Sequence, residues 1–261
     1  MANGPALKAA HIGVAMGNKG TEIAKAAASL VITNDDLDKL IVGIAAGRRI
    51  YSNLKKAIQY IISIHIPIIL TVTLPLFLGW IFPHIFTPVH VIFLELVMGP
   101  TCSIVYENEP LEKNIMNQKP RIMTETFLNW KELAISIIQG LVITLGVLFI
   151  YQWSVWIGGN EEKTRALVFT TLIFTNVFLS LVNRSFYYSV LACFKHKNIL
   201  FPIVIGATLL MLFLILYINP FANFFKLTGL NLKEMIIAML VAVISVLWME
   251  IYKWAKRRRL S

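Results

Sequence analysis

Four polar side chains lie within or beside long apolar runs of the sequence, where they could bind a metal cation. Glu95 and Thr101 belong to one run, His65 to the run before it and Asn176 to a later one. An ionisable residue in the hydrocarbon core of a membrane is costly, so Glu95 is by default a candidate for function. Carboxylate, hydroxyl and amide oxygens suit calcium or magnesium, whereas an imidazole nitrogen shifts the preference toward a transition metal. We therefore expect these four residues to be metal ligands, with a structural, paired role for Glu95 as the alternative.

Two residues that disfavour helix follow this carboxylate. Gly99 and Pro100 come four and five positions after Glu95. We expect them to open the helix there, because unwound backbone at membrane depth frees carbonyls that can coordinate a cation. Met98 and Cys102 could donate sulfur, but ordinary helix packing is the favoured interpretation. The sequence has no Cys-Pro-Cys or Cys-x-x-Cys motif, which argues against a heavy-metal site.

The helices that must position these residues are predicted from the apolar runs. Of the 261 residues, 57% are hydrophobic and 15% are charged, against about 25% charged in ordinary globular domains. A run of about 20 apolar residues can cross a hydrocarbon core of about 30 Å as a helix. We therefore predict an α-helical membrane protein, a six-transmembrane-helix bundle with spans at residues 59–81, 87–106, 132–155, 166–183, 199–217 and 235–252.

The segment before the first span has a different pattern. Short apolar runs at Ile12–Met16 and Ser29–Thr33 flank an Ala-rich segment, which is the strand–helix–strand order of a parallel α/β sheet. A stretch of apolar residues at helical spacing follows, with basic residues on its other faces, and it predicts an amphipathic stalk helix. The predicted parts are an α/β segment at 1–36, a stalk at 37–58, a membrane domain at 59–252 and a basic tail at 253–261.

The distribution of charge indicates orientation in a membrane. The formal net charge is +10, but the basic residues flank the apolar runs, which is typical of topology signals and argues against nucleic-acid binding. If the N-terminus lies in the cytosol, segments 107–131, 184–198 and 253–261 share that side and hold twelve basic residues, against four on the other side. By the positive-inside rule we expect both termini in the cytosol.

Several motifs occur together in one order. Pro5–Lys8 (PALK) and Ile12–Gly17 (IGVAMG) open the chain, and Leu94–Leu96 (LEL) and Glu107–Pro110 (ENEP) lie in and after the second span. In order and spacing, the first two resemble the end of the phosphorylation domain of P-type cation-transporting ATPases. The other two resemble the central membrane helices of pumps related to calcium ATPases. The likeness is close over residues 4–130, beyond which the chain matches as four further spans of appropriate length.

This resemblance implies an HAD-like phosphorylation-domain remnant and ATP-driven cation transport, with ATP and Mg²⁺ as cofactors of the full-length pump. In the family, an acidic cluster holds magnesium beside the phosphorylated aspartate. Asn3 stands at the corresponding place and cannot supply a carboxylate, so it is a degenerate remnant of that site. The sequence holds no Asp-Lys-Thr-Gly-Thr motif and no nucleotide domain. We therefore expect the chain alone to have no catalytic residue, to bind no cofactor and not to hydrolyse ATP.

The predicted cargo is a divalent metal cation, moved across the cell (cytoplasmic) membrane. In calcium-pumping relatives the central helices hold several carboxylates, but two of those positions are Ile68 and Gly99 here, so the calcium site is not reproduced. The expected partners are the cation, the lipid bilayer and, if it is supplied in trans, the N-terminal part of the pump. The alternatives are a non-catalytic membrane subunit or passive ion pathway from a truncated or split gene. A secondary transporter would show inverted repeats, and none is apparent.

Overall fold

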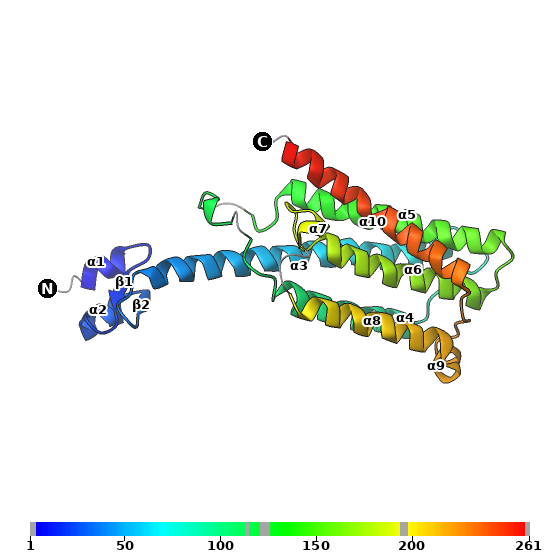
Figure 1. Cartoon of the computed structure of the whole chain (residues 1–261), viewed down its shortest axis with the longest axis horizontal. Helices are drawn as coiled ribbons and strands as arrows, with labels where there is room; N and C mark the ends of the chain where they lie inside the picture. The colour runs from blue at the N-terminus through cyan, green and yellow to red at the C-terminus, as the bar shows by residue number, and fades with distance from the viewer. Residues whose placement is uncertain (1–3, 113–114, 121–125, 194–197, 259–261) are drawn as a thin grey trace. The chain divides into compact units, whose positions relative to one another are not determined.

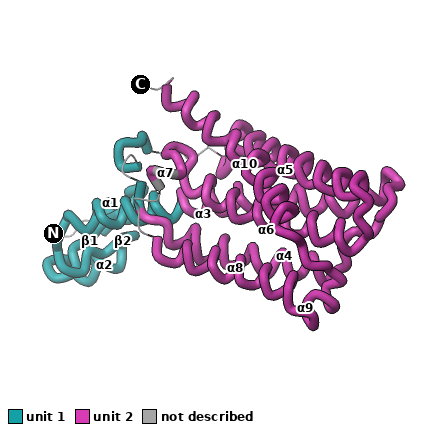
Figure 2. Tube along the Cα trace, turned by 45° about the vertical axis from the view of Figure 1, so that its right-hand side comes forward, with its two compact units in different colours: residues 1–51, 111–120 teal, residues 52–110, 121–261 magenta. Residues whose placement is uncertain are grey.

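The computed structural model describes residues 4–112, 115–120, 126–193 and 198–258. The chain divides into two compact units (Figure 2). The first contains residues 1–51 and 111–120, and the second contains residues 52–110 and 121–261. The four candidate ligands predicted in the apolar runs all belong to the second unit.

The first unit contains a small parallel sheet. Strands β1 (Val14–Met16) and β2 (Leu30–Ile32) pair with Ala15 opposite Val31. Helix α1 (Gly4–Ala9) precedes β1, and α2 (Glu22–Ala27) connects the two strands (Figure 1). The strand–helix–strand order predicted from the sequence is therefore confirmed. Two parallel strands need a crossover connection, and α2 lies in that connection.

Helix α3 (Asp38–Phe77) is one continuous helix. The Asp36 carboxylate accepts a hydrogen bond from the Asp38 backbone N–H at 3.0 Å and so supports the helix start. Within the first unit, Arg48 of α3 donates to the carbonyl of Ile115 at 2.7 Å, which lies in the short helix η2 (Ile115–Asn117). The residues of α3 beyond Tyr51 belong to the second unit.

Among the described residues, six helices are long and apolar enough to cross a membrane. The prediction of a six-helix membrane protein is therefore confirmed. Two short helices, α7 (Val190–Cys193) and α9 (Asn219–Phe224), lie in the connections on either side of the fifth of these helices (Figure 1). The six are α3, α4 (Pro88–Pro100) with its continuation η1 (Thr101–Tyr106), α5 (Trp130–Trp156), α6 (Glu161–Val182), α8 (Leu200–Tyr217) and α10 (Leu232–Arg258).

Helix α6 is the most buried of the six. Of the apolar 18-residue segment of α6, 83% is buried, whereas the corresponding segments of the other five helices are 28–41% buried. Helix α6 packs against α5 and α10. Small residues allow close packing between those two neighbours, because a Cβ on Gly146 of α5 would lie 2.1 Å from Oγ of Ser245 in α10. The five less buried helices expose apolar side chains, as is required of a surface that faces lipid.

A buried ion pair joins the end of η1 to the end of α6. Glu109 Oε1 accepts from Arg184 Nε at 2.7 Å, and Oε2 accepts from Nη2 at 3.3 Å. Their side chains are only 5% and 3% exposed. Asn198 donates to the same Oε1 at 2.9 Å, and Asn53 of α3 donates to the Glu109 carbonyl at 2.8 Å. The two charges are therefore compensated by each other and surrounded by amide groups.

Removing one partner of this ion pair should destabilise the second unit. We expect Glu109→Leu to cost about 3–5 kcal/mol, because the Arg184 charge then stays buried without its carboxylate. Combining Glu109→Leu with Arg184→Met should recover most of that loss, because neither charge is then taken out of water. Thermal unfolding of the purified protein in detergent measures both effects.

The control for this experiment is an ion pair on the surface of the first unit. Glu22 pairs with Lys25 at 2.8 Å, and the Glu22 side chain is 89% exposed. Glu22→Gln should therefore change stability by less than about 1 kcal/mol. A loss for Glu109→Leu no larger than this control would contradict the structural role of the buried pair.

Candidate cation site

Two of the predicted ligands meet across neighbouring helices. His65 lies on α3 and Glu95 on α4, and His65 Nε2 is 3.1 Å from Glu95 Oε1. Both side chains keep part of their surface exposed, 38% for His65 and 48% for Glu95. The structure thus places an imidazole nitrogen and a carboxylate oxygen together, each supplied by a different helix.

The other ring nitrogen of His65 determines what this contact can do. Nδ1 lies 2.8 Å from the Ile61 carbonyl, which can only accept a hydrogen bond. In the neutral ring the proton therefore belongs on Nδ1, and Nε2 presents a lone pair toward Glu95. Two acceptors at this distance repel unless a proton or a metal cation lies between them. The contact is therefore one in which a proton or a metal cation between the two atoms would be stabilised.

The distance also suits shared ligation of one metal ion. Two ligand atoms at about 2.1 Å from a six-coordinate metal ion lie about 3 Å apart when they meet at a right angle, whereas in a tetrahedral zinc site they lie about 3.4 Å apart. The observed 3.1 Å between His65 Nε2 and Glu95 Oε1 is closest to the right-angle separation. The pair can occupy two adjacent corners of a coordination shell.

Helix α5 packs directly against α3 next to His65. A Cβ on Gly140 of α5 would lie 2.7 Å from Cβ of Ile66 and 3.0 Å from the Ser63 carbonyl. Pro67 has no N–H to donate to that carbonyl, so the α3 backbone lacks one of its own hydrogen bonds at this point. The absence of a side chain at Gly140 is what lets α5 approach α3 so closely.

The prediction that Gly99 and Pro100 open the helix is wrong. Helix α4 continues through Pro100 and passes directly into η1, which is a π-helix. Pro100 cannot donate a backbone hydrogen bond, and the wider turn that follows accommodates this without unwinding the chain. The Gly99 carbonyl also accepts a hydrogen bond from Ser103 Oγ at 2.9 Å. Thr101, the third predicted ligand, is the buried first residue of η1.

The fourth predicted ligand, Asn176, has a hydrogen-bond partner on α3. It lies on α6, is 4% exposed, and its Oδ1 accepts from the Tyr60 hydroxyl. The Tyr60 ring in turn lies 5.3 Å from the Tyr106 ring. Tyr60 comes five residues before His65, about 7.5 Å along the helix axis. The roles of Asn176 and Thr101 as ligands stay predictions, and Asn3 lies outside the described residues.

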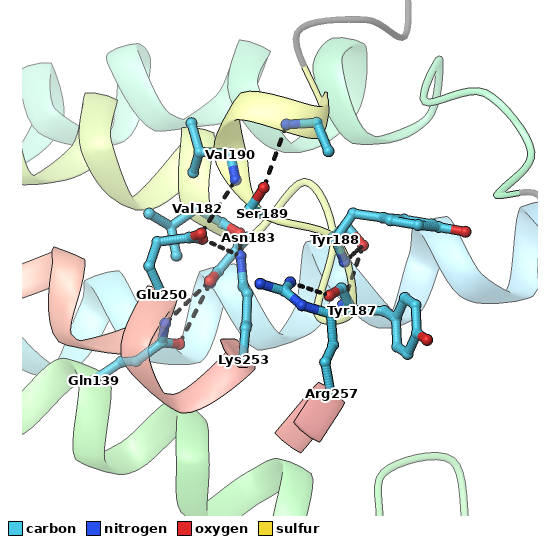
Figure 3. A network of polar contacts seen from close by, with 12 residues as sticks. Gln139, Val182, Asn183, Tyr187, Tyr188, Ser189, Val190, Glu250, Lys253 and Arg257 are labelled. Atoms are coloured by element: carbon cyan, nitrogen blue, oxygen red, sulfur yellow. Dashed lines mark hydrogen bonds and ion pairs between the residues drawn. The ribbon is translucent and has the colours of Figure 1, made fainter. Parts of the chain in front are cut away.

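The structure adds a polar network that the sequence analysis missed. Ser63 Oγ of α3 donates to Gln139 Oε1 at 3.1 Å. Gln139 Nε2 in turn donates to Asn183 Oδ1 at 3.0 Å, a contact that Figure 3 shows. All three residues are at most 2% exposed. The network links α3, two residues before His65, through α5 to the end of α6. The sequence feature that could have indicated this network is Gln139, a polar residue inside the apolar run 132–155.

Within the described ranges, no group of three or more His, Cys, Asp and Glu side chains could hold a metal ion. Of the four predicted ligands, His65 and Glu95 are the two whose side chains are in contact with each other in the described part of the chain. Other ligands of a bound cation would have to be hydroxyl, amide or carbonyl oxygens, or water, which are common ligands of divalent cations.

Comparison with known proteins identifies relatives along almost the whole chain. Residues 83–255 match the family "Cation transporting ATPase, C-terminus". Calcium-transporting ATPase 1 of Bacillus cereus is 30% identical over 97% of this chain and 30% of its own length. The protein of the same name in Schizosaccharomyces pombe is 26% identical over 98% of this chain and 28% of its own length. Human calcium-transporting ATPase type 2C member 1 is 24% identical over 97% of this chain and 27% of its own length.

The chain therefore spans about 30% of the length of these relatives. The family match covers more than half of the chain and includes five of its six membrane helices in whole or in large part. The chain belongs to the P-type cation-transporting ATPases and corresponds to their C-terminal membrane portion.

Proposed function

We propose that this chain is the C-terminal membrane part of an ATP-driven pump for a divalent metal cation, and that His65 and Glu95 are ligands of that cation. The observation that supports this most directly is the 3.1 Å contact between His65 Nε2 and Glu95 Oε1. The relatives are named as calcium-transporting ATPases. ATP and Mg²⁺ would act on the domains that such a pump has in addition to this segment.

The geometry suggests how transport could be coupled to movement of one helix. Each helix of the pair supplies one ligand, so any tilt of α3 relative to α4 changes the distance between the two ligands. In the proposed cycle, phosphorylation of the soluble domain moves α3, and the site loses affinity as His65 and Glu95 separate. The close contact at Gly140 is where α5 would support α3 during this tilt.

The donor set favours a divalent cation over a monovalent one. A carboxylate supplies the negative charge, and the imidazole supplies a nitrogen that binds transition metals well. The positions where calcium-pumping relatives are expected to have further acids hold Ile68 and Gly99. The ion can be identified by comparing Ca²⁺, Mn²⁺ and Zn²⁺ as activators of phosphorylation.

We further propose that the chain crosses the cell membrane with both termini in the cytosol. The support is the charge asymmetry, twelve basic residues on the proposed cytosolic side against four on the other. An even number of candidate spans among the described residues agrees with both termini on one side.

The first prediction concerns Glu95 in a pump reconstituted to full length. Glu95→Gln should abolish cation-stimulated phosphorylation from ATP, or weaken apparent cation affinity by about 10- to 100-fold, because a charged ligand contributes about 1.5–3 kcal/mol. Phosphorylation from inorganic phosphate should survive, because the soluble chemistry is unchanged. Both reactions are measured with labelled substrate across a cation titration.

The matched control is Glu107→Gln, which removes the same charge from an exposed residue just after η1. It should leave the cation dependence of both reactions within about twofold of the unchanged pump. If Glu95→Gln behaved like Glu107→Gln, the carboxylate would be structural and the transport site would lie elsewhere.

The second prediction concerns orientation. A cysteine introduced in the connection 157–160, between α5 and α6, should react with a membrane-impermeant reagent in intact cells. A cysteine introduced at exposed Asn117 should react only after the cells are opened, because the proposed topology places it in the cytosol. The opposite labelling pattern would show that the topology is inverted.

A further inference from the structure

The ring of His65 is held in the orientation that a metal ligand needs. Its Nδ1 lies 2.8 Å from the Ile61 carbonyl of the same helix, so the Nδ1–H is used within α3. Metal-binding histidines almost always donate their other ring N–H to a carbonyl, a carboxylate or water, which fixes the tautomer and the direction of the remaining nitrogen. That nitrogen, Nε2, lies 3.1 Å from Glu95 Oε1. The Ile61 carbonyl therefore presets Nε2 as the metal-binding atom.

The carboxylate in this contact has few acidic neighbours in the chain. Between residues 59 and 106, which include the apolar parts of α3 and α4, Glu95 is the only acidic residue. Every other acidic residue of the six membrane helices lies among the first three residues of its helix, except Glu250, which pairs with Lys253. This chain therefore supplies one negative charge and one neutral nitrogen to the proposed site.

A pair of this composition is poorly suited to calcium. Ca²⁺ takes about six to eight ligands, which in proteins are oxygens, and its affinity rises with the number of charged ligands. Divalent first-row transition metals bind imidazole well and accept carboxylate and water oxygens as further ligands. The nitrogen of His65 thus discriminates between two classes of cation that have the same charge.

The spacing of the pair agrees with a six-coordinate ion of the second class. Two bonds of about 2.1 Å at a right angle place their ligand atoms about 3 Å apart, whereas a tetrahedral zinc site places them about 3.4 Å apart. The 3.1 Å between His65 Nε2 and Glu95 Oε1 is closer to the first value. Both side chains are partly exposed, which leaves room for further ligands on the open side of the pair. Cations such as Mn²⁺ and Co²⁺ therefore match it better than tetrahedral Zn²⁺.

We propose that His65 makes the site selective for a six-coordinate, first-row transition-metal cation over Ca²⁺. This inference rests on the proposed function, because it names the class of cation that His65 and Glu95 bind. The Glu95 carboxylate attracts either kind of divalent ion and so contributes affinity. The imidazole of His65 contributes the choice between them. An oxygen in place of Nε2 removes that choice and leaves the carboxylate unchanged.

The test uses the pump reconstituted to full length, at fixed ATP and Mg²⁺, with Co²⁺, Mn²⁺ and Ca²⁺ compared as activators of phosphorylation. For the unchanged pump we expect the apparent affinity to fall in that order. His65→Gln places an amide oxygen at about the position of Nε2. The preference for Mn²⁺ over Ca²⁺ should then fall by about tenfold or more, because even the loss of a group that orients a ligand has an effect of this size. Phosphorylation from inorganic phosphate should survive and shows that the variant is folded.

A second measurement detects the ligand nitrogen directly. Pulsed electron paramagnetic resonance of bound Mn²⁺, recorded without nucleotide, should show coupling to a histidine nitrogen in the unchanged pump. His65→Gln should abolish this coupling. A role for His65 in packing alone would produce no such signal, so the measurement separates a ligand from a structural residue.

The matched control is His84→Gln, the same substitution at an exposed histidine in the connection between α3 and α4. It should leave the cation preference within about twofold and the nitrogen coupling unchanged. Three results would overturn the inference: tightest activation of the unchanged pump by Ca²⁺, equal changes in preference for the two histidine variants, or nitrogen coupling that persists in His65→Gln. The proposed function survives these results if Glu95→Gln still weakens activation by all three cations, and fails if Glu95→Gln has no effect.

Discussion

Polar groups inside a membrane helix bundle must be satisfied by one another, because the hydrocarbon core supplies no water. The described helices meet this constraint mostly through contacts between different helices. Glu109 and Arg184 compensate each other, Lys253 binds the last carbonyl of α6, and Gln139 pairs with Asn183. These contacts converge on the end of α6, the most buried helix. The packing of the second unit therefore depends on polar contacts as well as on apolar area.

The contact between His65 and Glu95 differs from these structural contacts. Taken together, its two side chains are the most exposed of the ion pairs described in the second unit, at 38% and 48%. If the imidazole is neutral with its proton directed to the Ile61 carbonyl, Nε2 has no proton to donate. A structural pair such as Glu109 with Arg184 has a permanent positive charge, so it needs no other ion. The His65–Glu95 contact requires a proton or a cation from outside. That chemical difference is why we propose a role in transport for this pair and a structural role for the others.

The six spans could be predicted because each is a long run of apolar residues, a property of the local sequence alone. The proximity of His65 and Glu95 could also be predicted from the sequence, since a short connection forces the first two spans to be antiparallel neighbours. The π-helix after Pro100 could not be predicted, because glycine and proline indicate a break in a helix but not how the surrounding packing accommodates it. The Tyr60–Asn176 and Gln139–Asn183 contacts join residues 116 and 44 positions apart. Local patterns hold no information on such partners.

The buried charges also change how the charge asymmetry should be weighed. Three of the twelve basic residues on the proposed cytosolic side, Arg184, Lys253 and Arg257, bind groups of the protein itself. On the other side Arg165 is similarly buried and donates to the Ile85 carbonyl. A charge that is neutralised inside the bundle contributes to packing, whereas a solvated one opposes transfer across the membrane. On that same side Lys163 pairs with Glu234 at 2.6 Å. Setting these five residues aside leaves nine basic residues of the sequence against two, so the charge asymmetry that supports the proposed orientation remains.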